Sequence, residues 1–135
     1  MAKVLVVDDD AKIRQALQFA LETVGHEVAT ASSKEEGKAA AVEFRPQLML
    51  VDVMMGSATE GFHLVWEMRQ MEDEALKTVP IIMLTGVHAT TELRFYPDQS
   101  DGYYQPGEYL PVQAWLDKPV KVEELLQTIR TVLGE

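Results

Sequence analysis

The apolar residues of this chain fall into two repeating patterns. Three short runs contain no polar residue, at positions 4–7 (VLVV), 48–51 (LMLV) and 81–84 (IIML). Such runs are typical of strands in a parallel sheet that is covered on both faces. Two further segments, 27–31 and 113–117, mix polar and apolar residues, as strands at the edges of a sheet can. The pattern therefore predicts five strands.

The segments between these strands have the period of amphipathic helices. Asp10 is a candidate N-cap and Gly25 a candidate end of the first helix. Residues 32–36 (SSKEE) offer a capping box for the second helix, which Pro46 ends. The apolar positions are Ile13, Ala16, Leu17, Ala20, Leu21 and Val24 in the first helix; Gly37, Ala40, Ala41 and Phe44 in the second; Leu64, Val65, Met68 and Met71 in the third; and Val122, Leu125, Leu126, Ile129 and Leu133 in the last. Strands that alternate with helices predict a doubly wound α/β domain of three layers with a parallel sheet.

Length and composition indicate a single domain. The chain has 135 residues, of which 47% are hydrophobic, and this suits one compact core. We therefore expect one domain over residues 1–135, with an atypical insertion at about 86–111. Prolines and glycines interrupt any long helix or strand in that insertion. The fourth helix is expected to be shortened, displaced or replaced by a long irregular segment.

The charge balance limits the classes of partner. With 22 acidic and 12 basic residues, the formal net charge is −10. The resulting field repels phosphate backbones and anionic lipid surfaces, so we expect no nucleic-acid or membrane partner. The chain contains no cysteine and no apolar run of membrane-spanning length, and we expect a cytoplasmic protein. Because it ends shortly after the last helix, its output is expected to pass through contacts with a downstream protein.

The residues with chemical potential follow the predicted strands. Asp8 and Asp9 follow the first strand, Asp52 the third, Thr85 the fourth and Lys118 the fifth. In open α/β sheets, ligands bind outside the carboxyl ends of the strands. Taken singly, Asp8 could cap a helix, Thr85 could end a strand and Lys118 could be a solvated charge. Together they predict a functional site at one edge of the sheet.

The acidic residues of this set predict a metal ion. Carboxylates crowded at one edge repel one another by about 4 kcal/mol per close pair at an intermediate effective dielectric constant. A cation relieves that repulsion. A donor set of oxygens, without His or Cys, favours a hard ion such as Mg²⁺, with Mn²⁺ as an alternative.

Four segments resemble the signatures of response-regulator receiver domains. They are residues 7–9 (VDD), 50–55 (LVDVMM), 80–86 (PIIMLTG) and 118–119 (KP). The resemblance covers essentially the whole chain except 86–111. It implies the flavodoxin-like strand order 2-1-3-4-5 and a function in bacterial two-component signal transduction. It also implies a phosphoacceptor rather than an enzyme, with at most self-phosphorylation from small donors and self-dephosphorylation.

The resemblance assigns a role to each residue of the site. Asp52 is the phosphoacceptor, which receives a phosphoryl group from a sensor histidine kinase or a histidine phosphotransfer protein. Lys118 and Thr85 contact the transferred group, and the peptide bond between Lys118 and Pro119 is expected to be cis. Thr85 and Trp115 form the switch pair that reports phosphorylation. Trp115 has an equally good interpretation as a plain core anchor.

The metal ligands are also implied by the resemblance. Asp9, Asp52 and the backbone carbonyl of Met54 would coordinate the ion directly, whereas Asp8 would act mainly through water. The apolar side chains of Met54 and Val87 beside the phosphoacceptor predict slow self-dephosphorylation, because neither can orient an attacking water.

Two segments depart from the family pattern. The loop at 55–61 (MGSATEG) lacks the usual proline and is one residue longer. The connection between Thr85 and Lys118 spans 32 residues and carries all four tyrosines of the chain, at positions 96, 103, 104 and 109. These aromatic residues either pack inward in place of the missing helix, which we favour, or form a surface for a partner. We expect a monomer or a weak dimer.

Two other functions remain open on the sequence. One is a magnesium-dependent phosphohydrolase of the haloacid-dehalogenase type, which also uses an aspartate nucleophile. That class needs a second aspartate two positions on, where this chain has Met54. The other is a receiver-like binding module that is never phosphorylated, against which the complete set of chemical residues argues.

Overall fold

Five parallel strands form the centre of the molecule. A computed structural model of the chain describes residues 2–53, 60–85 and 112–134. The strands are β1 (Lys3–Val7), β2 (Glu27–Ala31), β3 (Leu48–Asp52), β4 (Ile81–Thr85) and β5 (Ala114–Asp117), in the order β2-β1-β3-β4-β5. Every neighbouring pair is parallel. The fold class and strand order predicted from the sequence are therefore confirmed.

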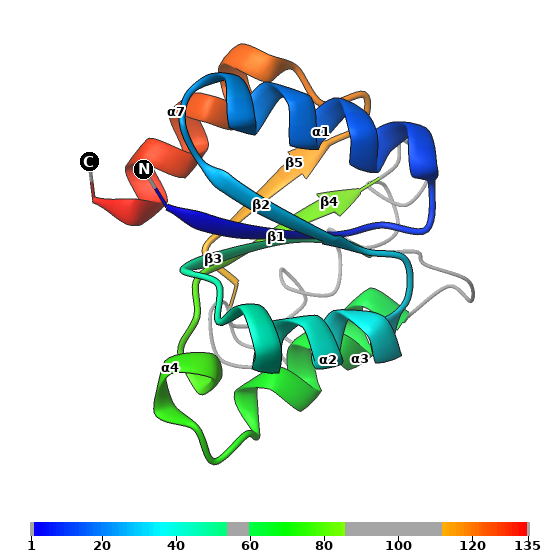
Figure 1. The fold of residues 1–135 in the computed structure, drawn as a ribbon, viewed down its shortest axis with the longest axis vertical. Coiled ribbons are helices and arrows are strands. Elements are labelled where there is room, and N and C mark those ends of the chain that lie inside the picture. The colour runs from blue at the N-terminus through cyan, green and yellow to red at the C-terminus, as the bar shows by residue number, and fades with distance from the viewer. Residues whose placement is uncertain (1, 54–59, 86–111, 135) are drawn as a thin grey trace, which may run out of the picture.

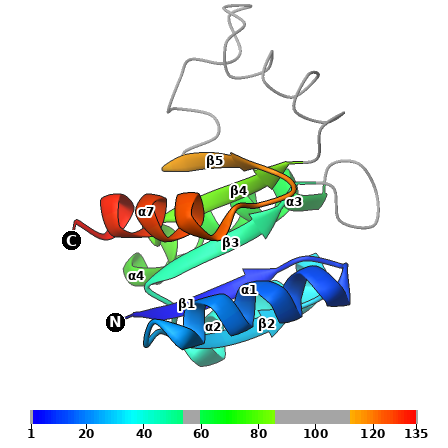
Figure 2. The same ribbon diagram turned by 90° about the horizontal axis from the view of Figure 1, so that it is seen from above.

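Helices cover both faces of this sheet. They are α1 (Ala11–Thr23), α2 (Lys34–Phe44), α3 (Glu60–Arg69), α4 (Glu74–Lys77) and α7 (Val122–Leu133). Figure 1 shows α1 and α7 on one face and α2, α3 and α4 on the other, and Figure 2 shows the twist of the sheet between them. The first and last described residues lie at the end of the sheet where the strands begin (Figures 1 and 2). None of the helices in the described part of the chain is long and apolar enough to cross a membrane.

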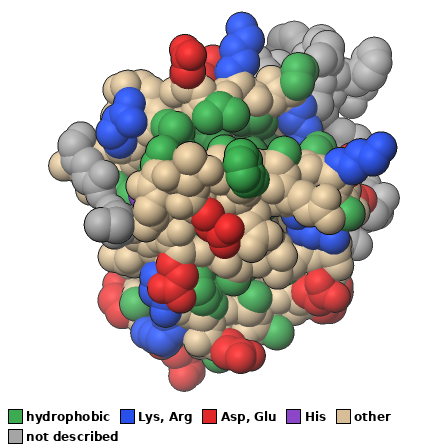
Figure 3. All heavy atoms as spheres, turned by 45° about the horizontal axis from the view of Figure 1, so that its top comes forward, with side chains coloured by type: hydrophobic (Ala, Val, Ile, Leu, Met, Phe, Trp, Pro, Cys, Tyr) green, Lys and Arg blue, Asp and Glu red, His purple; other side chains and the backbone are tan. Residues whose placement is uncertain are grey.

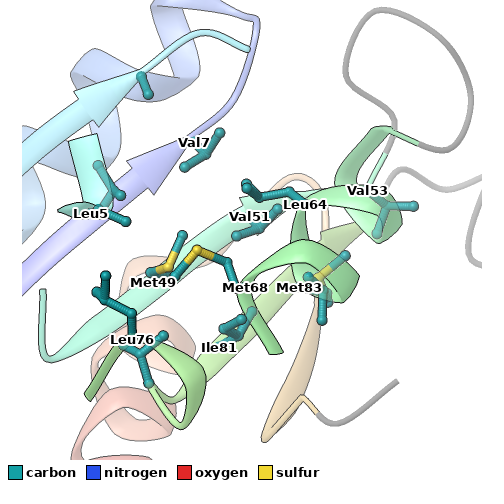
Figure 4. Packing of buried hydrophobic residues seen from close by; sticks show 14 residues of the cluster. Leu5, Val7, Met49, Val51, Val53, Leu64, Met68, Leu76, Ile81 and Met83 are labelled. Atoms are coloured by element: carbon teal, nitrogen blue, oxygen red, sulfur yellow. The ribbon is translucent and has the colours of Figure 1, made fainter. Parts of the chain in front are cut away.

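The side chains of the strands alternate between two hydrophobic clusters, one on each face. Leu5, Met49 and Met83 belong to the cluster under α2 and α3, which Figure 4 shows from close by. Val6 and Leu50 belong to the cluster under α1 and α7. Because both faces are buried, every position of a central strand must be apolar, and this explains the unbroken runs in the sequence.

The helix ends follow the local signals in the sequence. The Asp10 carboxylate accepts hydrogen bonds from the N–H groups of Lys12 and Ile13 and caps α1. Before α2, the Glu36 carboxylate accepts from the backbone N–H of Ser32, and the Glu36 N–H donates to the Ser33 hydroxyl, which confirms the capping box.

Some details of the helices differ from the sequence prediction. Val24 and Val122 are exposed although both continue an apolar stripe, because each lies at the outer end of its helix. The one-turn helix α4 was not predicted. It precedes β4 and is not the fourth helix expected from the sequence. That expectation concerns residues 86–111, including the four tyrosines, which lie outside the described residues.

Helix α1 allows a direct test of the packing. Leu21 is fully buried beneath α1, whereas Phe19 on the same helix is 74% exposed. On the face of the molecule drawn in Figure 3, hydrophobic side chains lie among charged ones. Leu21→Ala should lower the free energy of unfolding by about 2–5 kcal/mol, because it leaves a cavity. Phe19→Ala should change it by no more than about 0.5 kcal/mol. Urea denaturation measures both variants, and equal effects would contradict the assigned orientation of α1.

Candidate functional site

The alternation of side chains directs three charged residues to the same side of the sheet. Asp8 continues the series of Val4 and Val6 in β1, and Asp52 stands two positions after Leu50 in β3; these apolar residues all face α1 and α7. Lys118 stands two positions after Leu116, which faces the same helices. Because all strands are parallel, the three residues also emerge at the same edge. Their convergence therefore follows from strand register alone.

Asp8, Asp9 and Asp52 form an acidic cluster at this edge. One carboxylate oxygen from each residue lies within 4.8 Å of the others. Asp8 is completely buried and Asp52 is 4% exposed, while Asp9 is open to solvent. Carboxylate oxygens at such separations fit a hard divalent cation that keeps some of its own waters. Met54, whose carbonyl was expected to join them, lies outside the described residues.

Lys118 links the two buried acids. Its Nζ lies 2.9 Å from Oδ2 of Asp8 and 3.1 Å from Oδ1 of Asp52. Burial acts to lower the pKa of the Lys118 ammonium, but the hydrogen bond to Asp8 and the charges of both acids outweigh it, so the pKa lies above its ordinary value. Among these four described residues, one ammonium faces three carboxylates, and a divalent cation would balance the remaining negative charge.

Asp8 is fixed at several of its atoms. Its backbone N–H donates to the carbonyl of Ala31 in β2 at 3.0 Å, and its Oδ1 accepts from the N–H of Asp10 at 2.9 Å. Its backbone carbonyl accepts a hydrogen bond from Arg14. The N-cap of α1 is Asp10, so Asp8 serves to hold the turn before the helix rather than to cap it. Arg14 could not be identified from the sequence, because no pattern distinguishes an arginine on the flank of an apolar stripe.

Thr85 and Lys118 are joined through the backbone. The N–H of Lys118 donates to the carbonyl of Thr85 at 2.6 Å, and Thr85 is 2% exposed. The peptide bond from Lys118 to Pro119 is cis, as the resemblance predicted. Thr85 therefore lies beside the strand end from which the lysine side chain reaches the acids.

Gly61 brings α3 into direct contact with the end of β3. Its N–H donates to the carbonyl of Val53 at 2.9 Å. A Cβ at this position would lie 2.2 Å from the backbone oxygen of Asp52 and 2.6 Å from Cα of Val53. Only glycine permits this approach, so Gly61 helps to fix the backbone of Asp52. In the sequence, Gly61 is recognisable only as the end of the loop at 55–61.

Trp115 lies on the opposite face of the sheet from the acids. It is partly buried against the cluster under α2 and α3, and its ring lies 6.2 Å from that of Phe62 with an interplanar angle of 59°. It pairs in register with Met83, two positions before Thr85. Since alternate residues of a strand share a face, Trp115 and Thr85 are on the same side of the sheet.

Comparison with known proteins identifies the class. The response regulator receiver domain profile matches residues 4–97, and the chain belongs to this family. A putative response regulator of Chloroflexus aurantiacus has a similar structure, with a TM-score of 0.78 at 26% identity over 99% of this chain and 98% of that one. The chemotaxis protein CheY4 of Vibrio cholerae gives 0.76 at 35% identity over 98% of both chains.

Among curated proteins, the chain is similar to transcriptional regulators. It is 29% identical over 98% of its length to the DNA-binding dual master transcriptional regulator RpaA of Synechocystis, and covers 49% of that protein. It is 31% identical over 96% of its length to the phosphate regulon transcriptional regulatory protein PhoB of Pseudomonas aeruginosa, and covers 51% of it. The chain thus spans about half the length of these relatives. As a receiver domain, it is a component of two-component signalling, in which such domains interact with histidine kinases or phosphotransfer proteins.

The contact made by Gly61 leads to a prediction. In Gly61→Ala the new methyl group meets backbone atoms that cannot rotate away, so we expect a loss of about 1–3 kcal/mol in unfolding free energy. Gly37→Ala in α2 is the matched control, because its Cβ would lie 3.1–3.2 Å from side-chain methyls of Val7 and Leu64, which can shift. The helix propensity gained, about 1 kcal/mol, further offsets its cost. Denaturant titrations that find the two variants equally stable would contradict the close approach of α3.

Proposed function

We propose that this receiver accepts a phosphoryl group on Asp52 from the phosphohistidine of a sensor histidine kinase or a histidine phosphotransfer protein. The supporting observation is the position of the Asp52 carboxylate, which lies in the acidic cluster and 3.1 Å from the ammonium of Lys118. A carboxylate in this setting can act as a nucleophile, with the Lys118 ammonium already beside it to meet negative charge on the transferred group. We further propose that residues 1–135 are one receiver domain, with residues 86–111 as an insertion.

The transfer is an in-line substitution at phosphorus. An oxygen of Asp52 attacks, the bond from phosphorus to the imidazole nitrogen breaks, and the electron pair leaves with the imidazole. The product is an acyl phosphate on Asp52. The Lys118 ammonium then lies within reach of the new phosphoryl oxygens, and the Thr85 hydroxyl donates a hydrogen bond to them.

The acidic cluster would hold the divalent ion that receiver domains generally bind. Asp8, Asp9 and Asp52 supply oxygen donors that suit Mg²⁺, and the bound ion would balance negative charge on the transferred group. Asp9, the exposed member, faces the solvent from which an ion would enter. Asp8 is engaged by Lys118 and the Asp10 N–H, which agrees with a role for it mainly through water.

The output of the domain is proposed to pass through contacts with another protein or protein domain. RpaA is described as DNA-binding, but the net charge of −10 makes this chain a poor ligand for phosphate backbones. Neither alternative function gains support, since the sequence has Met54 where a phosphohydrolase of that type needs a second acid, and each acid required for phosphoacceptance is present. The expected slow dephosphorylation depends on Met54 and Val87, which lie outside the described residues, and remains a prediction.

The phosphoacceptor can be tested with a small donor. Wild-type protein incubated with acetyl phosphate and Mg²⁺ should gain the mass of one phosphoryl group, and Asp52→Asn should gain none. Asp73→Asn is the matched control, because Asp73 is an exposed acid paired with Arg45 at the start of α4, and it should gain the group as wild type does. Intact-protein mass spectrometry reads all three. A mass gain in Asp52→Asn equal to that of wild type would refute the assignment.

Trp115 offers a test of the switch. In a Trp66→Phe background, Trp115 is the remaining tryptophan. If it turns inward on phosphorylation, its fluorescence should shift to shorter wavelength and become less sensitive to acrylamide, because the indole leaves solvent. Acetyl phosphate with Mg²⁺ should produce this change, and Asp52→Asn should abolish it. An unchanged spectrum in fully phosphorylated protein would leave Trp115 as a core anchor only.

A further inference from the structure

Arg14 makes a short hydrogen bond to the turn that carries two of the acids. It lies near the start of α1, and its Nη1 donates to the backbone carbonyl of Asp8 at 2.6 Å. Its own backbone N–H donates to the carbonyl of Asp10 at 3.0 Å. Arg14 therefore contacts both ends of the turn from Asp8 to Asp10: its side chain bonds the Asp8 carbonyl, and its backbone N–H bonds the Asp10 carbonyl.

The bond to Asp8 has a geometric consequence for Asp9. The carbonyl of Asp8 belongs to the peptide plane that joins Asp8 to Asp9, and this plane is rigid. The other side of Asp8 is tied to β2 through the Ala31 carbonyl. Fixing the carbonyl fixes the direction in which the chain enters Asp9. Asp9 itself is exposed, and its carboxylate lies within 4.8 Å of those of the two buried acids.

Arg14 also lies near the start of α2. The pKa of the Glu36 carboxyl is lowered, first by hydrogen bonds from the hydroxyl and the backbone N–H of Ser32, and to a smaller extent by the charge of Arg14. The guanidinium charge therefore acts on the turn after β2 at longer range, whereas at the turn after β1 the same group makes a direct hydrogen bond.

We infer that Arg14 is a positioning residue for the divalent ion: its hydrogen bond to the Asp8 carbonyl orients Asp9 towards the acidic cluster. The inference rests on the proposed function, because it assumes that this cluster binds the ion. It assigns to Arg14 no contact with the ion or with the phosphoryl group.

Two effects of Arg14 on ion affinity have opposite signs. Its positive charge repels a divalent cation and weakens binding, whereas its hydrogen bond preorganises a ligand and strengthens binding. The charge is partly exposed to solvent and is therefore screened. Groups that orient metal ligands typically contribute about 10–100-fold in affinity. Positioning should therefore dominate, and the sign of the measured change separates the two effects.

The test is a Mg²⁺ titration of the unphosphorylated protein by calorimetry. Arg14→Met keeps the aliphatic stem and removes both charge and donor, and its dissociation constant should rise about tenfold. Arg14→Lys keeps the charge and one donor group, and should recover part of this loss. Lys12→Met is the matched control, because it also removes a positive charge from the first turn of α1. Within the described part of the chain, the Lys12 side chain makes no hydrogen bond to the turn. The affinity of Lys12→Met should equal or exceed that of wild type.

A second readout separates positioning from a general loss of stability. With acetyl phosphate as donor, Arg14→Met should shift the Mg²⁺ concentration at half-maximal rate upwards about tenfold and leave the rate at saturating Mg²⁺ near that of wild type. Thermal unfolding without Mg²⁺ should show a folded protein, and the rise in melting temperature on adding a fixed amount of Mg²⁺ should be smaller than in wild type.

The possible results are distinct. Binding by Arg14→Met as tight as that of wild type, or tighter, would overturn the inference and leave the proposed function intact. A lower saturating rate with unchanged half-saturation would overturn it too, because Arg14 would then act on the transfer itself. Absence of Mg²⁺ binding by wild type would refute the metal site of the proposed function, and the inference with it.

Discussion

The mutual repulsion of three carboxylates at one edge of the sheet is the constraint around which this structure is organised. At an intermediate effective dielectric constant, each close pair costs about 4 kcal/mol, which is a large fraction of the free energy of unfolding of a typical domain, about 5–15 kcal/mol. Asp8 and Asp52 are also buried, so water can screen them only weakly. The arrangement persists because Lys118 contacts both, and because the hydrophobic clusters on the two faces hold the strands that carry them. Under the proposed function, the remaining excess of negative charge favours a divalent cation, and the bound cation would in turn offset the repulsion between the acids and an incoming phosphoryl group.

The fold provides the rigidity that such a site needs. Asp52 ends a strand whose five residues are all buried, between two other buried strands. Its backbone is further confined by Gly61, which lies so close that no larger residue fits. The orientation of the acidic side chains is therefore fixed during folding. Under the proposed function, neither the ion nor the phosphodonor has to supply the free energy for it. This explains how a domain with few polar groups in its core can hold its reactive residues in one arrangement.

Much of this could be predicted from the sequence, because the relevant signals are local. Unbroken apolar runs located the central strands, and Asp10 and Ser33 marked the starts of α1 and α2. The acids and the lysine could be grouped because parallel strands end at a common edge. Arg14, Gly61 and the contact between Phe62 and Trp115 could not be predicted, since each depends on how a helix sits on the sheet. A glycine that nearly touches a distant backbone looks, in the sequence, like any glycine after a loop.

These unpredicted contacts link β5 and α3 to each other, and both elements to Asp52. Lys118 reaches Asp52 from the end of β5, and Trp115 in the same strand packs against Phe62 of α3. Phe62 follows Gly61, which contacts the backbone of Asp52 and Val53. A phosphoryl group on Asp52 that draws Lys118 and Thr85 towards itself would shift the carboxyl ends of β4 and β5. The Trp115 ring would then have to move against α3, which is itself held in place by the contact of Gly61 with Asp52. Because both β5 and α3 contact Asp52, a change of charge on Asp52 biases the packing of Trp115 against Phe62 on the opposite face of the sheet. Under the proposed function, this is the physical route by which phosphorylation alters the surface of the domain.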